Sequence, residues 1–386
     1  MFMNRKIFIG AAKFAMLAIV AFSLISSVSA ISRRDAILEF VDACQMPVQK
    51  EGYYGSPENN TSPEKVTTLE NTFAALEIIG ILRAPITNAS YPDALSIRSF
   101  LADLINSTGG VEDFDNDGNE FLSSTFQALQ ISKDLNITYN RTSLNNHMNF
   151  TVLSQNANGG FGANPSTKSN PSIFNSYYAL KILNFTGNLT DPIKNQVKNF
   201  VLSCNKSDYL FSGNPDSSDT SIAATAFAAM IYKEFFPEEL TNVFAEPMQT
   251  SFLAYLTSHQ GADGGFFDMN SSVPLLSTTY YAVKACSDIN IDIPGGDQHV
   301  IDWILSRQNF DGGFVEGTSP TTRSSMLATS FAVMALNMVR SSMDMLNGET
   351  AFSLSQIGGI VAVLVLLGVI VLLIVIAYYA KKRNRI

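Results

Sequence analysis

Apolar and polar positions along the chain follow a pattern of about fifty residues that recurs six times between residues 31 and 340. Each unit holds two stretches with the helical period of about 3.6 residues. The first stretch is amphipathic, as over residues 97–105, 193–202 and 300–307. The second stretch is almost entirely small and apolar and should be buried on most sides. Each unit therefore predicts an outer amphipathic helix followed by an inner apolar helix.

A glycine turn separates the two predicted helices of a unit. Residues 155–161, 260–266 and 308–314 read Gln-x-x-x-Gly-Gly-Phe, and weaker copies stand at 52–54, 109–111 and 209–211. Glycine can take the left-handed conformation that ends a helix, and it lets the chain turn without a Cβ clash. The preceding glutamine is expected to bond carbonyl groups at the end of its helix.

Each predicted inner helix carries one aromatic residue next to small side chains. These aromatics are spaced by 53, 51, 50, 53 and 51 residues. They are Phe73, Phe126, Tyr177, Phe227, Tyr280 and Phe331. Regular spacing of this kind indicates stacked repeats, each of which buries its apolar face against its neighbours. The prediction is an all-α (α/α)6 toroid of six helical-hairpin repeats over residues 31–340.

The two ends of the chain predict a membrane topology. Residues 1–30 combine Arg5, Lys6 and Lys13 with an apolar run and end in the small residue Ala30, which is typical of a cleaved signal peptide; an uncleaved signal anchor is the alternative. After a linker over 341–356, residues 357–380 form an uncharged span long enough to cross a bilayer. The basic tail at 381–386 marks the cytoplasmic side. We expect a single-pass type I protein of the cell membrane with its ectodomain outside.

The charge of the predicted ectodomain argues against two classes of partner, and its cysteines show no disulfide pattern. Without the signal and tail, 18 basic residues face 34 acidic ones, so the ectodomain carries about −16. This balance argues against nucleic acid and against anionic lipid headgroups as partners. Cys44, Cys204 and Cys286 show no paired spacing and are interpreted as buried apolar residues, with one disulfide as the alternative.

Acceptor sequences for N-linked glycans are abundant between the signal and the span. Together with the topology, this excess predicts a glycoprotein, although an unmodified surface rich in Asn, Ser and Thr would give the same sequences. The eleven acceptors are Asn59, Asn60, Asn88, Asn106, Asn136, Asn140, Asn149, Asn184, Asn188, Asn205 and Asn270.

The glycine turn followed by the aromatic helix resembles the repeat of the terpene cyclase and protein prenyltransferase superfamily, over about residues 33–340. The resemblance implies the toroid fold. In protein prenyltransferases it also implies zinc ligands at fixed positions: an Asp or His three residues, and a Cys one residue, before the inner-helix aromatic. Glu70, Ser123, Phe174, Ala224, Ser277 and Ala328 stand three residues before, and Thr72, Thr125, Ser176, Ala226, Thr279 and Ser330 stand one before. Zinc is therefore not expected. His147, His259 and His299 are predicted on the outer surface.

The resemblance to class II cyclases can be tested at their acid motif, D-x-D-D-T-A. Residues 216–221 approximate it, with Asp216 and Asp219 as candidate catalytic residues, but Ser218 replaces the proton-donating acid. A hydroxyl cannot supply that proton. The alternative is that Asp219 and Thr220 bond free amides at a helix start.

Residues 113–120 resemble the first half of a calcium loop, with oxygen ligands at Asp113, Asp115 and Asp117. Ser124 stands where the closing acid belongs, so a solvated acidic loop is the alternative. Calcium is the candidate metal, and no other cofactor is expected.

The missing zinc ligands and the altered acid motif favour a non-catalytic binding or structural ectodomain for a protein, lipid or glycan ligand. An enzyme acting on an isoprenoid or other lipid is the first alternative. A glycan-cleaving enzyme using Glu70 and Asp219 is the second. The interior of the ring separates these functions. A wide cavity with aromatic residues and converging carboxylates favours an enzyme, whereas an interior plugged by apolar side chains leaves only the outer surface.

Overall fold

The computed structural model describes residues 31–45, 67–82, 94–114, 119–206, 210–268, 271–317 and 323–339, together with 344, 346–347 and 350–351. Among these residues no helix has the length and apolarity needed to cross a bilayer. The predicted signal peptide, membrane span and basic tail lie outside the described residues. So do the weak glycine copy at 52–54 and the acceptors Asn59, Asn60, Asn88 and Asn270.

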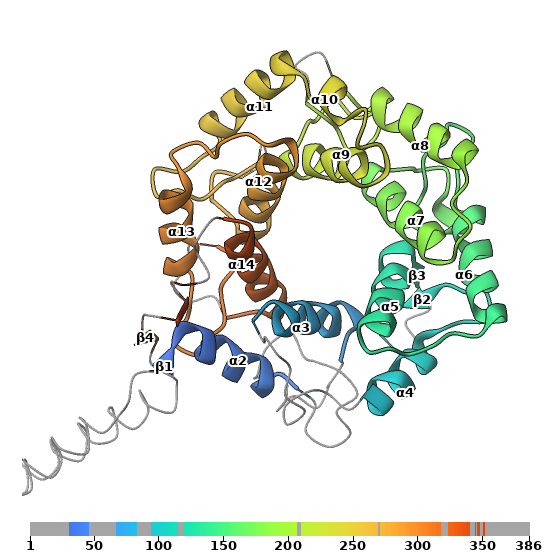
Figure 1. Ribbon diagram of the computed structural model, residues 1–386, viewed down its shortest axis with the longest axis horizontal. Helices are drawn as coiled ribbons and strands as arrows, with labels where there is room; N and C mark the ends of the chain where they lie inside the picture. Colours follow the sequence, from blue (N-terminus) through green and yellow to red (C-terminus); the bar gives the residue numbers. More distant parts are fainter. Residues whose placement is uncertain are drawn as a thin grey trace, which may run out of the picture.

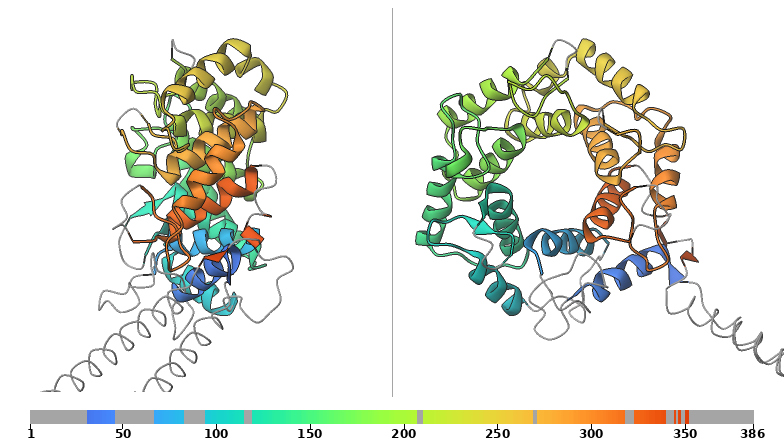
Figure 2. Two further views of the ribbon diagram at one scale, coloured as in Figure 1. Left: turned by 90° about the vertical axis from the view of Figure 1, so that its left-hand side faces the viewer. Right: turned by 180° about the vertical axis from the view of Figure 1, so that it is seen from behind.

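The described helices form two concentric layers, one inside the other (Figure 1). The inner helices are α3 (Leu69–Leu82), α5 (Leu122–Asp134), α7 (Ile173–Phe185), α9 (Ile222–Phe235), α12 (Leu276–Ile289) and α14 (Met326–Met338). The outer helices are α2 (Arg33–Ala43), α4 (Ala94–Leu104), α6 (Arg141–Leu153), α8 (Asp191–Ser203), α11 (Glu246–Ser258) and α13 (Asp297–Ser306). Helix α14 packs against α3 and closes the ring, as the view from behind also shows (Figure 2). The predicted all-α toroid of helical hairpins is confirmed.

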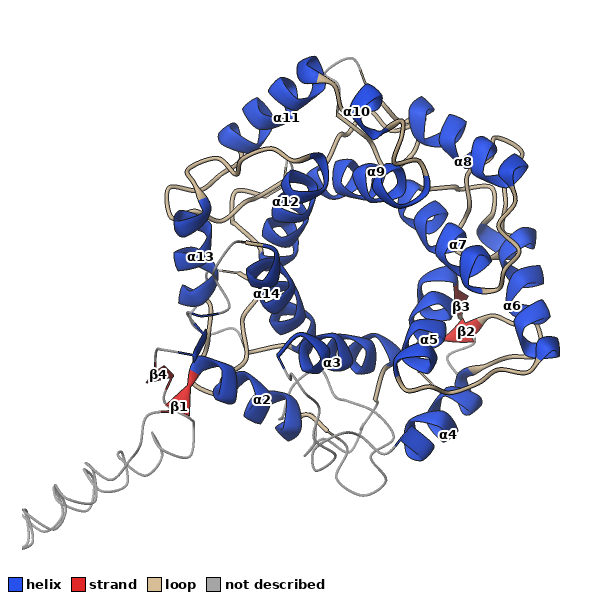
Figure 3. Cartoon of the chain, viewed as in Figure 1, coloured by secondary structure: helices blue, strands red, loops and turns tan. Residues whose placement is uncertain are grey.

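Short additional elements decorate the ring without changing its two layers (Figure 3). The 3-10 turn η2 (Pro165–Thr167) and the helix α10 (Leu240–Val243) lie in connecting segments. Strand β2 (Val111–Glu112) pairs antiparallel with β3 (Glu120–Phe121). Strand β1 (Ile31–Ser32) pairs antiparallel with β4 (Thr350–Ala351), so the described chain ends meet at the outer edge, beside α2.

Each glycine turn packs against the outer helix of the following repeat. Gly312 has φ +89°, and a Cβ on it would overlap the backbone oxygen of Ala36 in α2. A Cβ on Gly265 would overlap the ring of Trp303 in α13. The paired glycines therefore do more than turn the chain, because they let one repeat approach the next at backbone distance. In this way the last turn is bound to the first outer helix.

The glutamine that precedes each strong turn closes that turn and not the end of its own helix, contrary to our expectation. Gln155, Gln260 and Gln308 each donate from Nε2 to the carbonyl of the first glycine four residues on, at 3.1–3.2 Å. Gln308 also accepts from Arg33 of α2 at 2.8 Å. The glutamine amide thus holds the turn in the shape that the next outer helix requires.

In α5, α7, α9, α12 and α14 a buried hydroxyl near the start of the helix binds the backbone of the preceding turn. Phe161 N–H donates to Ser176 Oγ at 3.0 Å, and Phe266 N–H donates to Thr279 Oγ1 at 3.0 Å. The same bond joins Val111 to Thr125, Phe211 to Thr225 and Phe314 to Thr329. Thr72 holds the corresponding position in α3 and, like Thr125 and Ser176, donates to the carbonyl four residues back; the turn before it lies outside the described residues. These are the turn-binding hydroxyls.

Replacing Thr279 by valine is expected to lower the free energy of unfolding by about 1–3 kcal/mol, because the Phe266 N–H would stay buried without an acceptor. Thr278→Val in the same helix is the matched control, since Thr278 is only half-buried. Denaturant unfolding of both variants measures the difference. Equal stability of the two variants would contradict the role given to the hydroxyl.

Candidate functional site

The interior of the ring holds a cavity of about 420 Å³, lined by inner helices alone. Its wall contains aromatic residues, two methionines, two glutamates, two lysines and a few small residues. Polar residues stand at one level, five positions after the turn-binding hydroxyl: Glu77, Gln130, Lys181 and Lys284, with Met230 and Met334 completing that level. The interior is therefore not plugged, and its size is that of sites for small ligands.

The turn-binding hydroxyls correct the alignment of two repeats. Aligned on them, the residue that follows is Phe73, Phe126, Tyr177, Ala226, Tyr280 or Ser330. Phe227 and Phe331 lie one position further along, so the predicted register of the fourth and sixth inner helices is off by one. The reason is that the first and the second residue after the hydroxyl both reach the cavity, so an aromatic residue can stand at either position. The hydroxyl has one position only, because it bonds the backbone of the turn. The positions implied for zinc change to Ala223 and Leu327 in these repeats, and neither residue can bind zinc.

Six aromatic residues, one from each inner helix, follow one another around the cavity wall. The ring centroids are 6.2 Å apart for Phe73 and Phe126, 5.7 Å for Phe126 and Tyr178, and 5.9 Å for Tyr178 and Phe227. Phe227 lies 5.5 Å from Tyr281, which lies 6.0 Å from Phe331. We call Phe73, Phe126, Tyr178, Phe227, Tyr281 and Phe331 the aromatic belt. Such contacts favour a rigid wall of π faces and edges.

Two further tyrosines lie beside the belt in the cavity wall. Tyr177 and Tyr280 line the cavity and lie 5.4 Å from Phe227 and from Phe331, respectively. Burial, followed by the charge of Glu70, raises the pKa of Tyr178 to about 12. Burial also raises the pKa of Tyr177, Tyr280 and Tyr281. All four hydroxyls are therefore neutral at physiological pH and can donate a hydrogen bond to a ligand.

Two carboxyl groups on α3 face the cavity. Glu70 is exposed at its mouth and Glu77 is half-buried in its wall, two helical turns further on. Desolvation, then the charge of Asp134, raises the pKa of Glu77. Desolvation, then Asp113, raises the pKa of Glu70. Among the described residues, neither carboxylate forms an ion pair. Seven residues of helix separate the two groups by about 10.5 Å along the axis.

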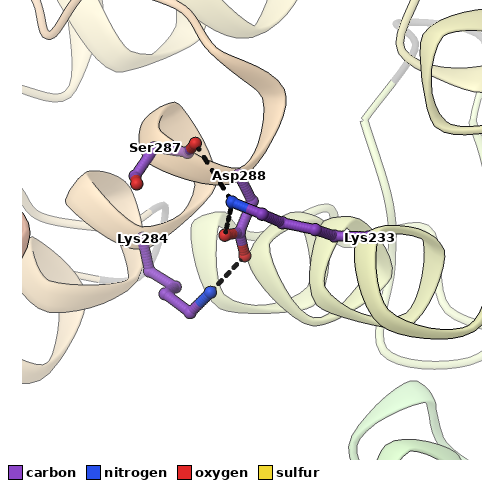
Figure 4. Close-up of polar contacts among 4 residues, drawn as sticks. All are labelled: Lys233, Lys284, Ser287 and Asp288. Carbon is purple, nitrogen blue, oxygen red and sulfur yellow. Dashed lines mark hydrogen bonds and ion pairs between the residues drawn. The ribbon is translucent and has the colours of Figure 1, made fainter. Parts of the chain in front are cut away.

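The two lysines of the cavity are already paired. Lys181 contacts Glu234 at 2.6 Å. Lys284 pairs with Asp288, whose side chain is only 2 % exposed, and Lys233 of α9 approaches the same carboxylate at 3.0 Å (Figure 4). Asp288 thereby joins α9 to α12 and neutralises Lys284, which lines the cavity. The negative charges of Glu70 and Glu77 are thus the unpaired charges of this wall.

The candidate acid residues Asp216 and Asp219 do not reach this cavity. Both are exposed on the loop before α9, and Asp219 lines a separate cavity of about 220 Å³. The helix is capped by Ser221, which accepts from Ala224 N–H, and not by Asp219 or Thr220, as the alternative had it. Asp268 of the next repeat accepts from Ile222 N–H at 3.1 Å. Glycan cleavage would require Asp219 and Glu70 to face the same cavity, and the structure places them in different ones.

The candidate calcium loop lies partly outside the described residues, because Asp115 and Asp117 fall in the gap at 115–118. Asp113 accepts from Glu70 N–H at 3.0 Å and so caps the start of α3. Among the residues that the structure describes, no three His, Cys, Asp or Glu side chains come together as metal ligands. Calcium binding by the full loop stays a prediction.

The histidines differ from their predicted placement. His147 is fully buried, its Nδ1–H donates to Gly109 O at 2.6 Å, and its ring packs edge-on against Tyr139 at 5.4 Å. Burial lowers its pKa. His259 and His299 are half-buried. The surface prediction is therefore wrong for His147, because its outer helix turns this position towards the preceding glycine turn.

The cysteines and the glycan acceptors lie where their predicted roles allow. Cys44, Cys204 and Cys286 are buried and free, as predicted. Burial raises the pKa of Cys204 and of Cys286 to about 12. Among the described acceptors, Asn136, Asn140, Asn149 and Asn184 are exposed, and Asn106, Asn188 and Asn205 are half-buried. Glycosylation itself stays a prediction.

Comparison with known proteins identifies a family that has this toroid fold. The chain matches the prenyltransferase alpha-alpha toroid domain over residues 11–174, 166–317 and 270–356. The protein belongs to this family. Among curated protein sequences none matches this prenyltransferase-like toroid.

Solved structures share the toroid at low sequence identity. Protein geranylgeranyltransferase-I of Candida albicans, complexed with GGPP, has a TM-score of 0.54 and 17 % identity, over 75 % of this chain and 90 % of that one. A type II terpene cyclase of Scytonema, in complex with geranylgeranyl dihydroxybenzoate, has a TM-score of 0.51 and 11 % identity, over 81 % and 97 %. At these identities the likeness extends to the prenyltransferase-like fold alone.

Sequence reasoning missed the main residues of the cavity. Glu77, Lys181 and Lys284 belong to no recognised motif, and the belt position of Tyr178 was not separated from that of Tyr177. One signal was available. Glu77 follows Glu70 by seven residues, and residues seven apart lie on the same face of a helix.

Proposed function

We propose that this protein is a membrane-anchored binding ectodomain whose cavity holds an isoprenoid or similarly apolar chain. The observation that carries the proposal is the cavity of about 420 Å³ with the aromatic belt in its wall. Apolar chains bind to such walls by burying surface, at roughly 25 cal/mol per Å². Of the two solved structures, one is complexed with GGPP and the other with geranylgeranyl dihydroxybenzoate, which supports an isoprenoid ligand class here. The membrane anchor remains part of the proposal, resting on residues 357–380.

Filling the cavity is expected to abolish binding. Met230→Trp and Gln127→Trp each place an indole in the cavity wall, from α9 and α5, and should weaken binding of geranylgeraniol at least tenfold. Leu202→Trp, on the exposed face of α8, is the matched control. Calorimetric titration of the full chain in a neutral detergent measures binding, and circular dichroism confirms the fold. Undiminished binding by both cavity variants would overturn the proposal.

A second candidate function is acid-initiated cyclisation of a polyene. An open cavity with an aromatic wall and two carboxyl groups is the arrangement expected of an enzyme, and Glu77 is the candidate acid. Its raised pKa extends the protonated form to higher pH, and the aromatic belt lines the same cavity. The carboxyl proton would add to a terminal alkene carbon, the π electron pair forming the new C–H bond and leaving a carbocation. Loss of a proton from the cyclised cation would restore the carboxyl group. Mass spectrometry of extracted geranylgeraniol incubations tests this, with Glu77→Gln as the inactive control.

A further inference from the structure

The charges around the cavity point to the head group of its ligand. We propose that the cavity selects an organic cation, an alkyl chain bearing a quaternary ammonium group, and rejects anionic heads such as diphosphate. This inference rests on the proposed binding of an apolar chain in the same cavity. It adds the sign of the charge that the chain carries.

The first argument is the balance of unpaired charge. Lys181 and Lys284 are the cations of the wall, and each already has a carboxylate, Glu234 and Asp288, respectively. An anionic ligand would have to compete with these carboxylates for the lysines. No arginine lines the cavity among the residues described. By contrast, Glu70 and Glu77 face the cavity without a cation of their own among those residues.

The second argument is the aromatic belt. The face of an aromatic ring attracts a cation, and the attraction grows when the cation is desolvated. The wall already shows this contact, because Lys181 Nζ lies 5.8 Å from the ring centroids of Phe126 and Tyr177. A trimethylammonium group cannot donate hydrogen bonds, so it loses less hydration than a primary ammonium group on entering the cavity. Rings and carboxylates together are the surroundings that stabilise it.

The third argument is that the hydroxyls and the carboxyl groups converge on one space. Tyr280 is more than nine-tenths buried, and it feels the charge of Glu77 across the cavity. Glu70 likewise acts on Tyr178 and Tyr281. One ligand head can therefore meet a carboxylate and at least two aromatic rings at the same time.

Three amphiphiles with the same chain test the inference: octyltrimethylammonium, octanol and octyl sulfate. Each is titrated, below its micelle-forming concentration, into the full chain in a maltoside detergent. We expect octyltrimethylammonium to bind at least tenfold more tightly than octyl sulfate, with octanol between them. Because every variant sees the same micelles, differences between variants report the cavity.

Glu77→Gln and Glu70→Gln identify the groups responsible. Each should lower the ratio of octyltrimethylammonium affinity to octanol affinity about tenfold, and Asp216→Asn, outside the cavity, should leave this ratio unchanged. Glutamine is neutral, so at position 77 it removes a charge that the half-buried site disfavours, and at position 70 it replaces an exposed side chain. The fold is therefore expected to persist. Thermal unfolding checks this point.

The outcomes separate the two proposals. If octanol binds and octyltrimethylammonium binds no more tightly, the charge inference is overturned while the proposed function stands. If the ammonium binds and octanol does not, the proposed apolar-chain function fails and the cation site stands. If the glutamine variants bind the ammonium as the wild type does, the assignment to Glu70 and Glu77 is wrong.

Discussion

Gly312→Ala is expected to lower the free energy of unfolding by about 3–5 kcal/mol. Two effects add. Alanine at φ +89° is strained, and its Cβ would overlap the backbone oxygen of Ala36, which cannot move without shifting α2. The substitution therefore opens the ring where its last repeat contacts its first. Denaturant unfolding can be followed by the fluorescence of Trp303, the single tryptophan of the chain, on the helix before this turn.

Gly187→Ala is the matched control for Gly312→Ala. Gly187 also has a positive φ, +72°, but a Cβ there would meet nothing within 4 Å. The cost should be limited to backbone strain of about 1–2 kcal/mol. If the two variants lose the same stability, the close approach of the last turn to α2 contributes nothing, and our account of ring closure is wrong.

Asp288→Ala should lower the free energy of unfolding by about 2–4 kcal/mol, because it leaves two lysines facing each other between α9 and α12. The effect is below that of a fully buried pair, since the side chain of Lys233 is 49 % exposed. The side chain of Lys284 is only 23 % exposed, so leaving its charge without a partner costs more free energy than it does for Lys233. Thermal and denaturant unfolding measure the change.

Two comparisons isolate the role of Asp288. Asp216→Ala removes an exposed loop carboxylate and should change stability by no more than about 0.5 kcal/mol. The combination of Lys233→Met, Lys284→Met and Asp288→Leu replaces all three charges by apolar groups and should recover most of the loss. Failure of the triple variant to recover stability would mean that Asp288 acts through its backbone position and not through charge.

The repeat architecture could be predicted from sequence because every part of it is written locally. Helical periodicity, the glycine pairs and the small-aromatic inner helices each recur in one repeat after another. The inner and outer assignment followed from apolar content, since residues 222–231 carry one polar side chain, Thr225. A closed ring of helical hairpins is then the arrangement in which each apolar inner helix is covered on both sides.

The site could not be predicted in the same way, because its geometry joins different repeats. Asp288 and Lys233 are 55 residues apart, and no motif links them. The cavity faces became clear only when the turn-binding hydroxyls fixed the rotation of each inner helix. One recurring signal was overlooked. The turns begin at residues 45, 105, 155, 205, 260 and 308, and an aromatic residue stands five positions before each of these. The six are Phe40, Phe100, Phe150, Phe200, Tyr255 and Trp303. Four of these rings, Phe40, Phe150, Phe200 and Trp303, fill the space left by the second glycine of a described turn.

The contact between the last glycine turn and α2 also bears on the order of synthesis. A ribosome releases Ala36 nearly three hundred residues before Gly312, so α2 must wait for its partner while most of the chain is made. Contacts so distant in sequence form late, after the loop between them has been ordered. Until then, the apolar faces of α2 and α3 that meet the last repeat lack their cover. The first repeat made is therefore the last to be completed, and its apolar helices stay exposed to aggregation for longest.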